Sequence, residues 1–137
     1  MSDTGEGGTV TRVEELCFDQ DGLRVVTARA GDHLDSRIAG VAELAVGDRL
    51  AGYLRTLHQR AAADGVSQVV VDLAQLEFMN AVCLRSFVAW IQALQELPRG
   101  KQYRVRFRPN HQLPWQRRSI NALRCFAADL ITVEAGG

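Results

Sequence analysis

The sequence predicts an α/β fold, with a mixed, mostly parallel sheet and helices mainly on one of its faces. Three observations lead to this prediction. Short apolar runs alternate with segments of helical periodicity along most of the chain. One run, Val69–Val71, is apolar throughout, as expected of a strand that is covered on both faces. Another, at residues 101–108, alternates apolar and basic residues, as expected of a strand with one face in water.

The predicted element order is β-β-α-β-α-β-α-β, within a single domain that spans residues 10–135. Residues 1–9 are polar and rich in glycine, so we expect them to form a disordered tail. The turn Asp19–Gly22 joins the first two strands into a hairpin. The segment Gly31–Gly47 mixes polar and apolar residues around Gly40, and we expect a loop with a short helical turn there. The predicted strands are Val10–Phe18, Leu23–Ala30, Val69–Asp72, Lys101–Arg108 and Leu130–Val133.

Three helices are predicted from apolar residues that recur every three or four positions. The first has Asp48 as its N-cap and Gly65 just beyond its C-terminus. The second is capped by Asn80 and ends before Pro98, and the third begins near Pro114. The apolar stripes are Leu50, Tyr53, Leu54, Leu57 and Ala61 in the first helix, Leu84, Phe87, Val88, Ile91 and Leu94 in the second, and Ile120, Leu123, Phe126 and Ala127 in the third.

The composition is that of an ordinary globular protein. Of the 137 residues, 47% are hydrophobic and 23% are charged, and the formal net charge is +0. A neutral chain exerts no overall electrostatic attraction on nucleic acid or on a membrane surface. No apolar stretch has the length of a signal-peptide core or a membrane span. The three cysteines, Cys17, Cys83 and Cys125, lack metal-ligand spacing, so we expect reduced thiols, no metal, no cofactor and a cytoplasmic location.

Two motifs resemble the signature of the STAS family, which contains sulfate transporters and anti-sigma factor antagonists. The first is an apolar strand that ends in Val71-Asp72-Leu73-Ala74 and is followed by Phe78–Leu84 at the start of a helix. The second, Gly31–Asp35, is similar to the family's Gly-x-Leu-Asp after the second strand. The predicted element order agrees with that of the family from residue 10 to residue 134. The resemblance implies a small STAS-like sandwich.

The chain departs from the family at the helix start. In the family, a serine there is phosphorylated by a partner kinase that is also an anti-sigma factor, and phosphorylation breaks the complex. This chain has Ala81 at that position, which lacks a hydroxyl to accept phosphate. Asn80 stands where the family has Asp, and Cys83 where it has Gly. Ala81 could therefore make a constitutive binder or mark a lost function, and the sequence leaves both readings open.

The resemblance implies a non-catalytic protein–protein interaction module that acts in bacterial signal transduction and transcription regulation. Its partner would be an anti-sigma factor or serine-kinase-type ATPase, or another STAS protein, with a homodimer as a further form. The module would not be phosphorylated at the usual site. We expect the partner-binding residues to be Met79, Asn80, Ala81, Val82, Cys83, Leu84, Arg85 and Ser86. The segment Gly31–Gly47 is expected to contribute neighbouring surface.

A basic segment, Arg99–Arg124, suggests an alternative function. It contains eight of the sixteen Lys and Arg residues and no acid, and Tyr103, Phe107 and Trp115 lie among them. The simplest interpretation is a solvated sheet face and a solvated helix face. An arginine surface for an acidic protein partner is the next, and a small nucleic-acid-binding protein is the third. The basic residues are Arg99, Lys101, Arg104, Arg106, Arg108, Arg117, Arg118 and Arg124.

Catalysis is not expected. Cys83 at a helix N-terminus could be a nucleophile, because that position lowers the pKa of a thiol. A nucleophile also needs a base within reach, and His33, His58 and His111 are not expected near it. We expect His58 to face water and Cys83 to be a small buried residue.

Overall fold

The computed structural model describes residues 10–135 of the chain, and the predicted tail at residues 1–9 lies outside this part. Strands, short 3-10 helices (η) and α-helices alternate along it. Their order is β1 Val10–Arg12, η1 Glu14–Leu16, β2 Phe18–Gln20, β3 Leu23–Ala30, β4 His33–Ala42, η2 Leu44–Val46, α1 Gly47–Asp64, β5 Gln68–Asp72, β6 Leu76–Met79, α2 Ala81–Glu96, η3 Arg99–Lys101, β7 Arg104–Arg108, α3 Pro114–Phe126 and β8 Ile131–Val133.

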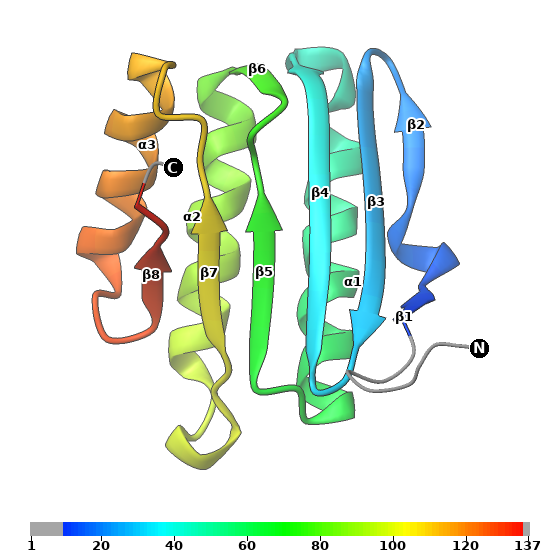
Figure 1. Cartoon of the computed structure of the whole chain (residues 1–137), viewed down its shortest axis with the longest axis vertical. Helices are drawn as coiled ribbons and strands as arrows, with labels where there is room; N and C mark the ends of the chain where they lie inside the picture. Colours follow the sequence, from blue (N-terminus) through cyan, green and yellow to red (C-terminus); the bar gives the residue numbers. More distant parts are fainter. Residues whose placement is uncertain (1–9, 136–137) are drawn as a thin grey trace.

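The strands form one eight-stranded mixed sheet, in the order β1-β3-β4-β5-β7-β8 (Figure 1). Strands β4, β5, β7 and β8 are paired in parallel, while β3 runs antiparallel to β1, β2 and β4. The short strand β6 pairs in parallel with the far end of β4. Along the chain, each of the helices α1, α2 and α3 connects two strands that run parallel in the sheet, as crossover connections require.

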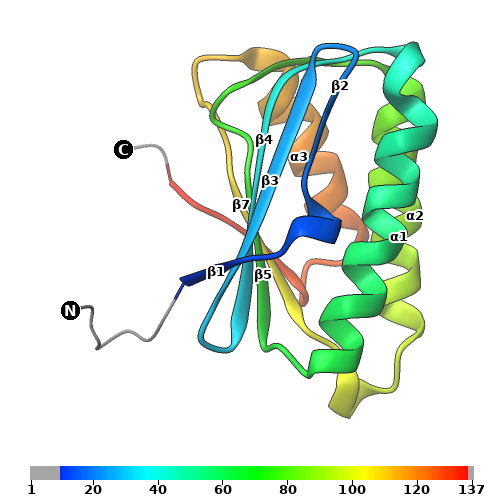
Figure 2. The same cartoon turned by 90° about the vertical axis from the view of Figure 1, so that its right-hand side faces the viewer.

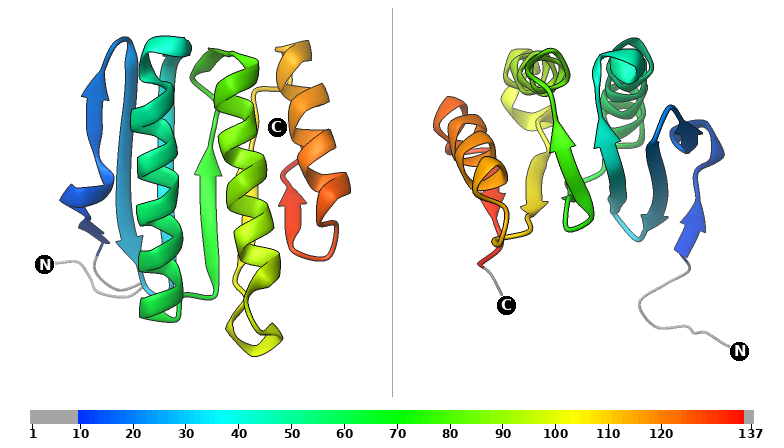
Figure 3. Two further views of the ribbon diagram at one scale, coloured as in Figure 1. Left: turned by 180° about the vertical axis from the view of Figure 1, so that it is seen from behind. Right: turned by 90° about the horizontal axis from the view of Figure 1, so that it is seen from above.

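All three α-helices lie on one face of the sheet, and the other face is left without helices (Figures 2 and 3). The stripe predicted for α1 is buried in full, and Gly65 ends that helix in the left-handed conformation, with φ 66°. Tyr103, Val105 and Phe107 point into the same core from β7 and its approach. The predicted α/β class, with helices mainly on one face, is confirmed. Within residues 10–135, none of the helices combines the length and apolarity needed to cross a membrane.

The prediction of a loop for the segment Gly31–Gly47 is wrong, because most of it forms the ten-residue strand β4. The short helical turn expected in the same segment is present as η2. Along β4, Leu34, Ser36 and Ile38 point into the core. Because Ser36 is polar, it obscures the alternation of apolar and polar residues expected of a strand. Only the fold shows which groups form hydrogen bonds with its buried hydroxyl. It hydrogen-bonds to the hydroxyl of Tyr53, and Thr27 donates to it over 3.2 Å.

Smaller corrections concern element ends. The first predicted strand is broken by η1, which turns Leu16 into the core, so β1 and β2 are separate. Helix α1 begins at Gly47 after Val46, and Asp48 lies in its first turn instead of capping it. Phe126, predicted on the buried side of α3, is 46% exposed at the end of that helix.

Candidate docking site

The link between β6 and α2 is a capped helix start, as predicted. Asn80 has an extended backbone, with φ −77° and ψ 170°, and its side-chain Oδ1 accepts a hydrogen bond from the Cys83 N–H at 2.9 Å. This bond satisfies one of the N–H groups that a helix leaves unpaired at its N-terminus. The remaining N–H groups and the positive end of the helix dipole face the surface at Ala81.

The segment that follows β4 supports this helix start. The Asn80 N–H donates to the Ala42 carbonyl at 2.9 Å, and the Cys83 thiol lies 3.6 Å from the Glu43 carbonyl oxygen. A Cβ placed on Gly47 would lie 3.8 Å from Val82 Cγ1. Residues 42–47 and residues 78–86 therefore form one structural unit at the end of the sheet, which we call the docking tip.

The docking tip exposes apolar side chains. Leu44 is 68% exposed, Phe78 45% and Val82 41%, and Ala81 is exposed beside them. They come from η2, β6 and the first turn of α2. These segments lie at the end of the sheet where β4 and β6 finish (Figure 1). Large apolar side chains that gather at one surface spot are typical of an interaction site.

The eight residues predicted for partner binding differ in their accessibility. Ala81, Val82 and Arg85 are exposed, while Met79, Asn80 and Leu84 are partly buried. Cys83 is fully buried and Ser86 lines a cavity of about 230 Å³ between α1 and α2, so neither is placed at the exposed surface of the tip.

Leu44 and Phe78 lie on the docking tip but were not in the predicted set. Phe78 belongs to the STAS-like motif, so its sequence position was a usable signal. Leu44 belongs to the segment Gly31–Gly47, which was expected to contribute neighbouring surface, but only the pairing of β4 with β6 singles out this residue.

The environment of Cys83 is that of a structural thiol. Burial raises the pKa of this thiol, opposite to the shift that activates a nucleophile. The histidines are engaged elsewhere, His33 beside Asp32 and His111 at the Glu134 carbonyl. Among the residues that the structure describes, no group of His, Cys, Asp and Glu is placed to hold a metal ion.

The prediction that His58 faces water is wrong. His58 is half-buried, and its Nδ1 lies 2.7 Å from the Tyr103 hydroxyl. Trp90 Nε1 donates to the same hydroxyl at 2.8 Å. Because an indole can only donate, the Tyr103 oxygen accepts from Trp90, and its O–H is free to donate to a neutral His58.

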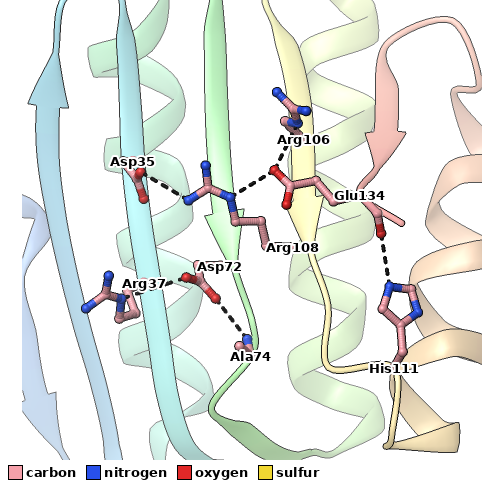
Figure 4. A network of polar contacts seen from close by, with 8 residues as sticks. All are labelled: Asp35, Arg37, Asp72, Ala74, Arg106, Arg108, His111 and Glu134. Carbon is pink, nitrogen blue, oxygen red and sulfur yellow. Dashed lines mark hydrogen bonds and ion pairs between the residues drawn. The ribbon is translucent and has the colours of Figure 1, made fainter. Parts of the chain in front are cut away.

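Two arginines of β7, Arg106 and Arg108, have acidic partners on the face of the sheet that carries no helices (Figure 4). Arg106 and Arg108 both contact Glu134, at 3.1 and 2.9 Å, and Arg108 also lies 3.6 Å from Asp35. The hydrogen bond to Glu134 raises the pKa of Arg108. The basic run in the sequence is therefore partly neutralised by acids that the fold brings from β4 and from the end of β8.

This topology defines a class of fold, the STAS fold of anti-sigma factor antagonists. The chain is similar to the crystal structure of an anti-sigma factor antagonist from Mycobacterium paratuberculosis, with a TM-score of 0.59. The similarity covers 86% of this chain and 90% of that chain, at 14% sequence identity, and concerns the fold. At the level of sequence, neither a family model nor a curated protein matched the chain. The predicted STAS-like fold is thus confirmed by structure.

Proposed function

We propose that the chain is a non-catalytic regulatory module that binds a protein partner through the docking tip. The observation that carries the proposal is the cluster of Leu44, Phe78 and Val82, all exposed around a capped helix start. Exposed apolar side chains provide the area that a partner buries, and the helix N-terminus provides donors at its centre. The similarity to an anti-sigma factor antagonist supports a regulatory role.

The partner we propose is an anti-sigma factor or serine-kinase-type ATPase, or another STAS protein. A phosphate at the helix start would add about −1.5 to −2 charge to the centre of the contact. Ala81 has a methyl group there and accepts no phosphate. Binding would therefore be constitutive, without a phosphorylation switch at this position.

Affinity purification of the tagged full chain from its native cell tests the proposal. Ala81→Glu should abolish partner recovery, because it places a charged side chain at the centre of the apolar contact. Val82→Ser should weaken recovery without a loss of folding, since that side chain is exposed. Ala63→Glu is the matched control, because Ala63 is an exposed alanine near the far end of α1. Equal partner recovery with wild type and Ala81→Glu would disprove the proposal.

The nucleic-acid alternative has less support. Arg106 and Arg108 are bound to acids on the sheet face, whereas Arg117 and Arg118 are carried by α3 on the other side of the sheet. Binding to DNA or RNA that falls steeply as salt rises would favour it. Binding that is absent at low salt would remove it.

A further inference from the structure

A second surface, formed by α3 and β8, has the features of a binding site. Helix α3 and strand β8 lie side by side at one edge of the sheet (Figures 1 and 3). Residues of both elements line a groove of about 470 Å³. Its apolar floor includes Ile120 and Val133. Arg117, Arg118 and Arg124 of α3 also line it. We call it the α3–β8 groove.

The charge of this groove is not balanced. Among the described residues, no carboxylate forms a salt bridge with Arg117, Arg118 or Arg124. Within residues 10–135, the one acid that lines the groove is Glu134, and its carboxylate is already bound by Arg106 on the sheet face. Arg124 donates to the neutral side chain of Asn121, at 3.0 Å. The groove is thus complementary to a ligand that carries several negative charges.

The groove also contains a free sheet edge. In the part of the chain that the structure describes, β8 is the last strand of the sheet and pairs with β7 alone. The ladder to β7 uses the Leu130 carbonyl and the Glu134 N–H. Peptide groups alternate in direction along a strand, so the N–H and C=O of Val133 point away from β7. They are available to an extended chain that joins the sheet as a further strand.

We propose that the α3–β8 groove binds an extended, acidic segment of a protein partner. The segment would pair with Val133. On the side of the segment that faces α3, it would place apolar side chains on the floor of the groove and carboxylates against the arginines of α3. A nucleic acid supplies charge but no strand backbone, and the apolar floor and the free edge favour a peptide. The inference is independent of the proposed function of the docking tip.

A direct test uses the full-length chain and a short fluorescein-labelled peptide in which glutamate and valine alternate in pairs, so that each face of the bound strand carries both residue types. Fluorescence anisotropy at about 0.15 M salt should show saturable binding. A peptide with glutamine in place of glutamate should bind at least about tenfold more weakly. A peptide N-methylated on the edge that faces β8 should lose binding as well, because methylation removes strand pairing and leaves the charges. Both comparisons use the wild-type chain, so they do not depend on how a variant folds.

Variants then locate the site. Arg117→Glu combined with Arg124→Glu should weaken binding of the glutamate peptide at least about tenfold. Arg99→Glu combined with Lys101→Glu is the matched control, since it makes the same charge change in η3. Ala81→Glu should leave this binding unchanged, which separates it from the docking tip. Absent binding, equal loss in the control variant, insensitivity to N-methylation, self-association through this groove, or displacement by a single-stranded oligonucleotide would each overturn the proposal.

Discussion

Tyr103→Phe probes the buried chain of hydrogen bonds from Trp90 to His58. The change removes one oxygen and keeps the ring, so packing around the core is preserved. The indole N–H of Trp90, which is buried, loses the acceptor that lies 2.8 Å away. An unsatisfied buried donor costs about 1–3 kcal/mol. His58 is only half-buried and can bind water instead, so its lost hydrogen bond adds little to this cost. We expect the free energy of unfolding to fall by about 2 kcal/mol in total.

The free energy of unfolding is measured by urea denaturation, with circular dichroism as the signal. For a chain of this length, the expected loss corresponds to a fall in Tm of about 6–10 °C. The slope of the free energy against urea should not change, because the surface exposed on unfolding is the same. A loss below about 0.5 kcal/mol would show that the Trp90–Tyr103 hydrogen bond is not formed in solution and would refute this reasoning.

The same network gives a pH dependence. Burial lowers the pKa of His58 below its ordinary value of 6.5. The unfolded chain then binds more protons than the folded chain between the two pKa values, so stability is lost as the pH falls through this window. We expect wild type to lose more stability than His58→Gln between about pH 7 and pH 5. Parallel stability profiles for the two proteins would contradict a depressed pKa.

Three further predictions concern local structure. Asn80→Ala should lower the free energy of unfolding by about 0.5–2 kcal/mol, while Asn80→Asp retains the cap, as urea denaturation would show. Gly40→Ala should be far more damaging to thermal stability than Gly31→Ala, because its Cβ would lie 2.1 Å from a backbone oxygen, whereas nothing lies within 4 Å at Gly31; similar Tm values would contradict this. Cys125, which is exposed, should react with a thiol reagent at neutral pH much faster than Cys83, and a fast Cys83 would reopen the nucleophile hypothesis.

Local chemistry made much of the fold readable from sequence. The cap at Asn80, the left-handed Gly65 and the start of α3 at Pro114 each depend on residues within one turn of the chain. The alternation along residues 103–108 predicted which side of β7 is buried, because successive side chains of a strand point to opposite faces. The position of Ala81 at an exposed helix start could also be predicted, because Ala81 directly follows the capping residue Asn80.

Long-range pairing decided the rest. Strand β4 was hidden because its buried Ser36 is acceptable only where Tyr53 and Thr27 supply hydrogen-bond partners, and these come from α1 and β3. Leu44 reached the docking tip for a similar reason, since residues at the ends of β4 and β6 are neighbours only once the strands are paired.

The sequence by itself determined the three α-helices and their approximate ends and, apart from Phe126, which side of each helix is apolar, because those properties depend on neighbouring residues. Only the tertiary structure decided which charges are free. Arg106 and Arg108 were counted as part of a basic run until the fold placed Glu134 and Asp35 beside them. Arg117 of the same run remained in the α3–β8 groove. Electrostatic interactions depend on distance in space, and the folded chain sets that distance.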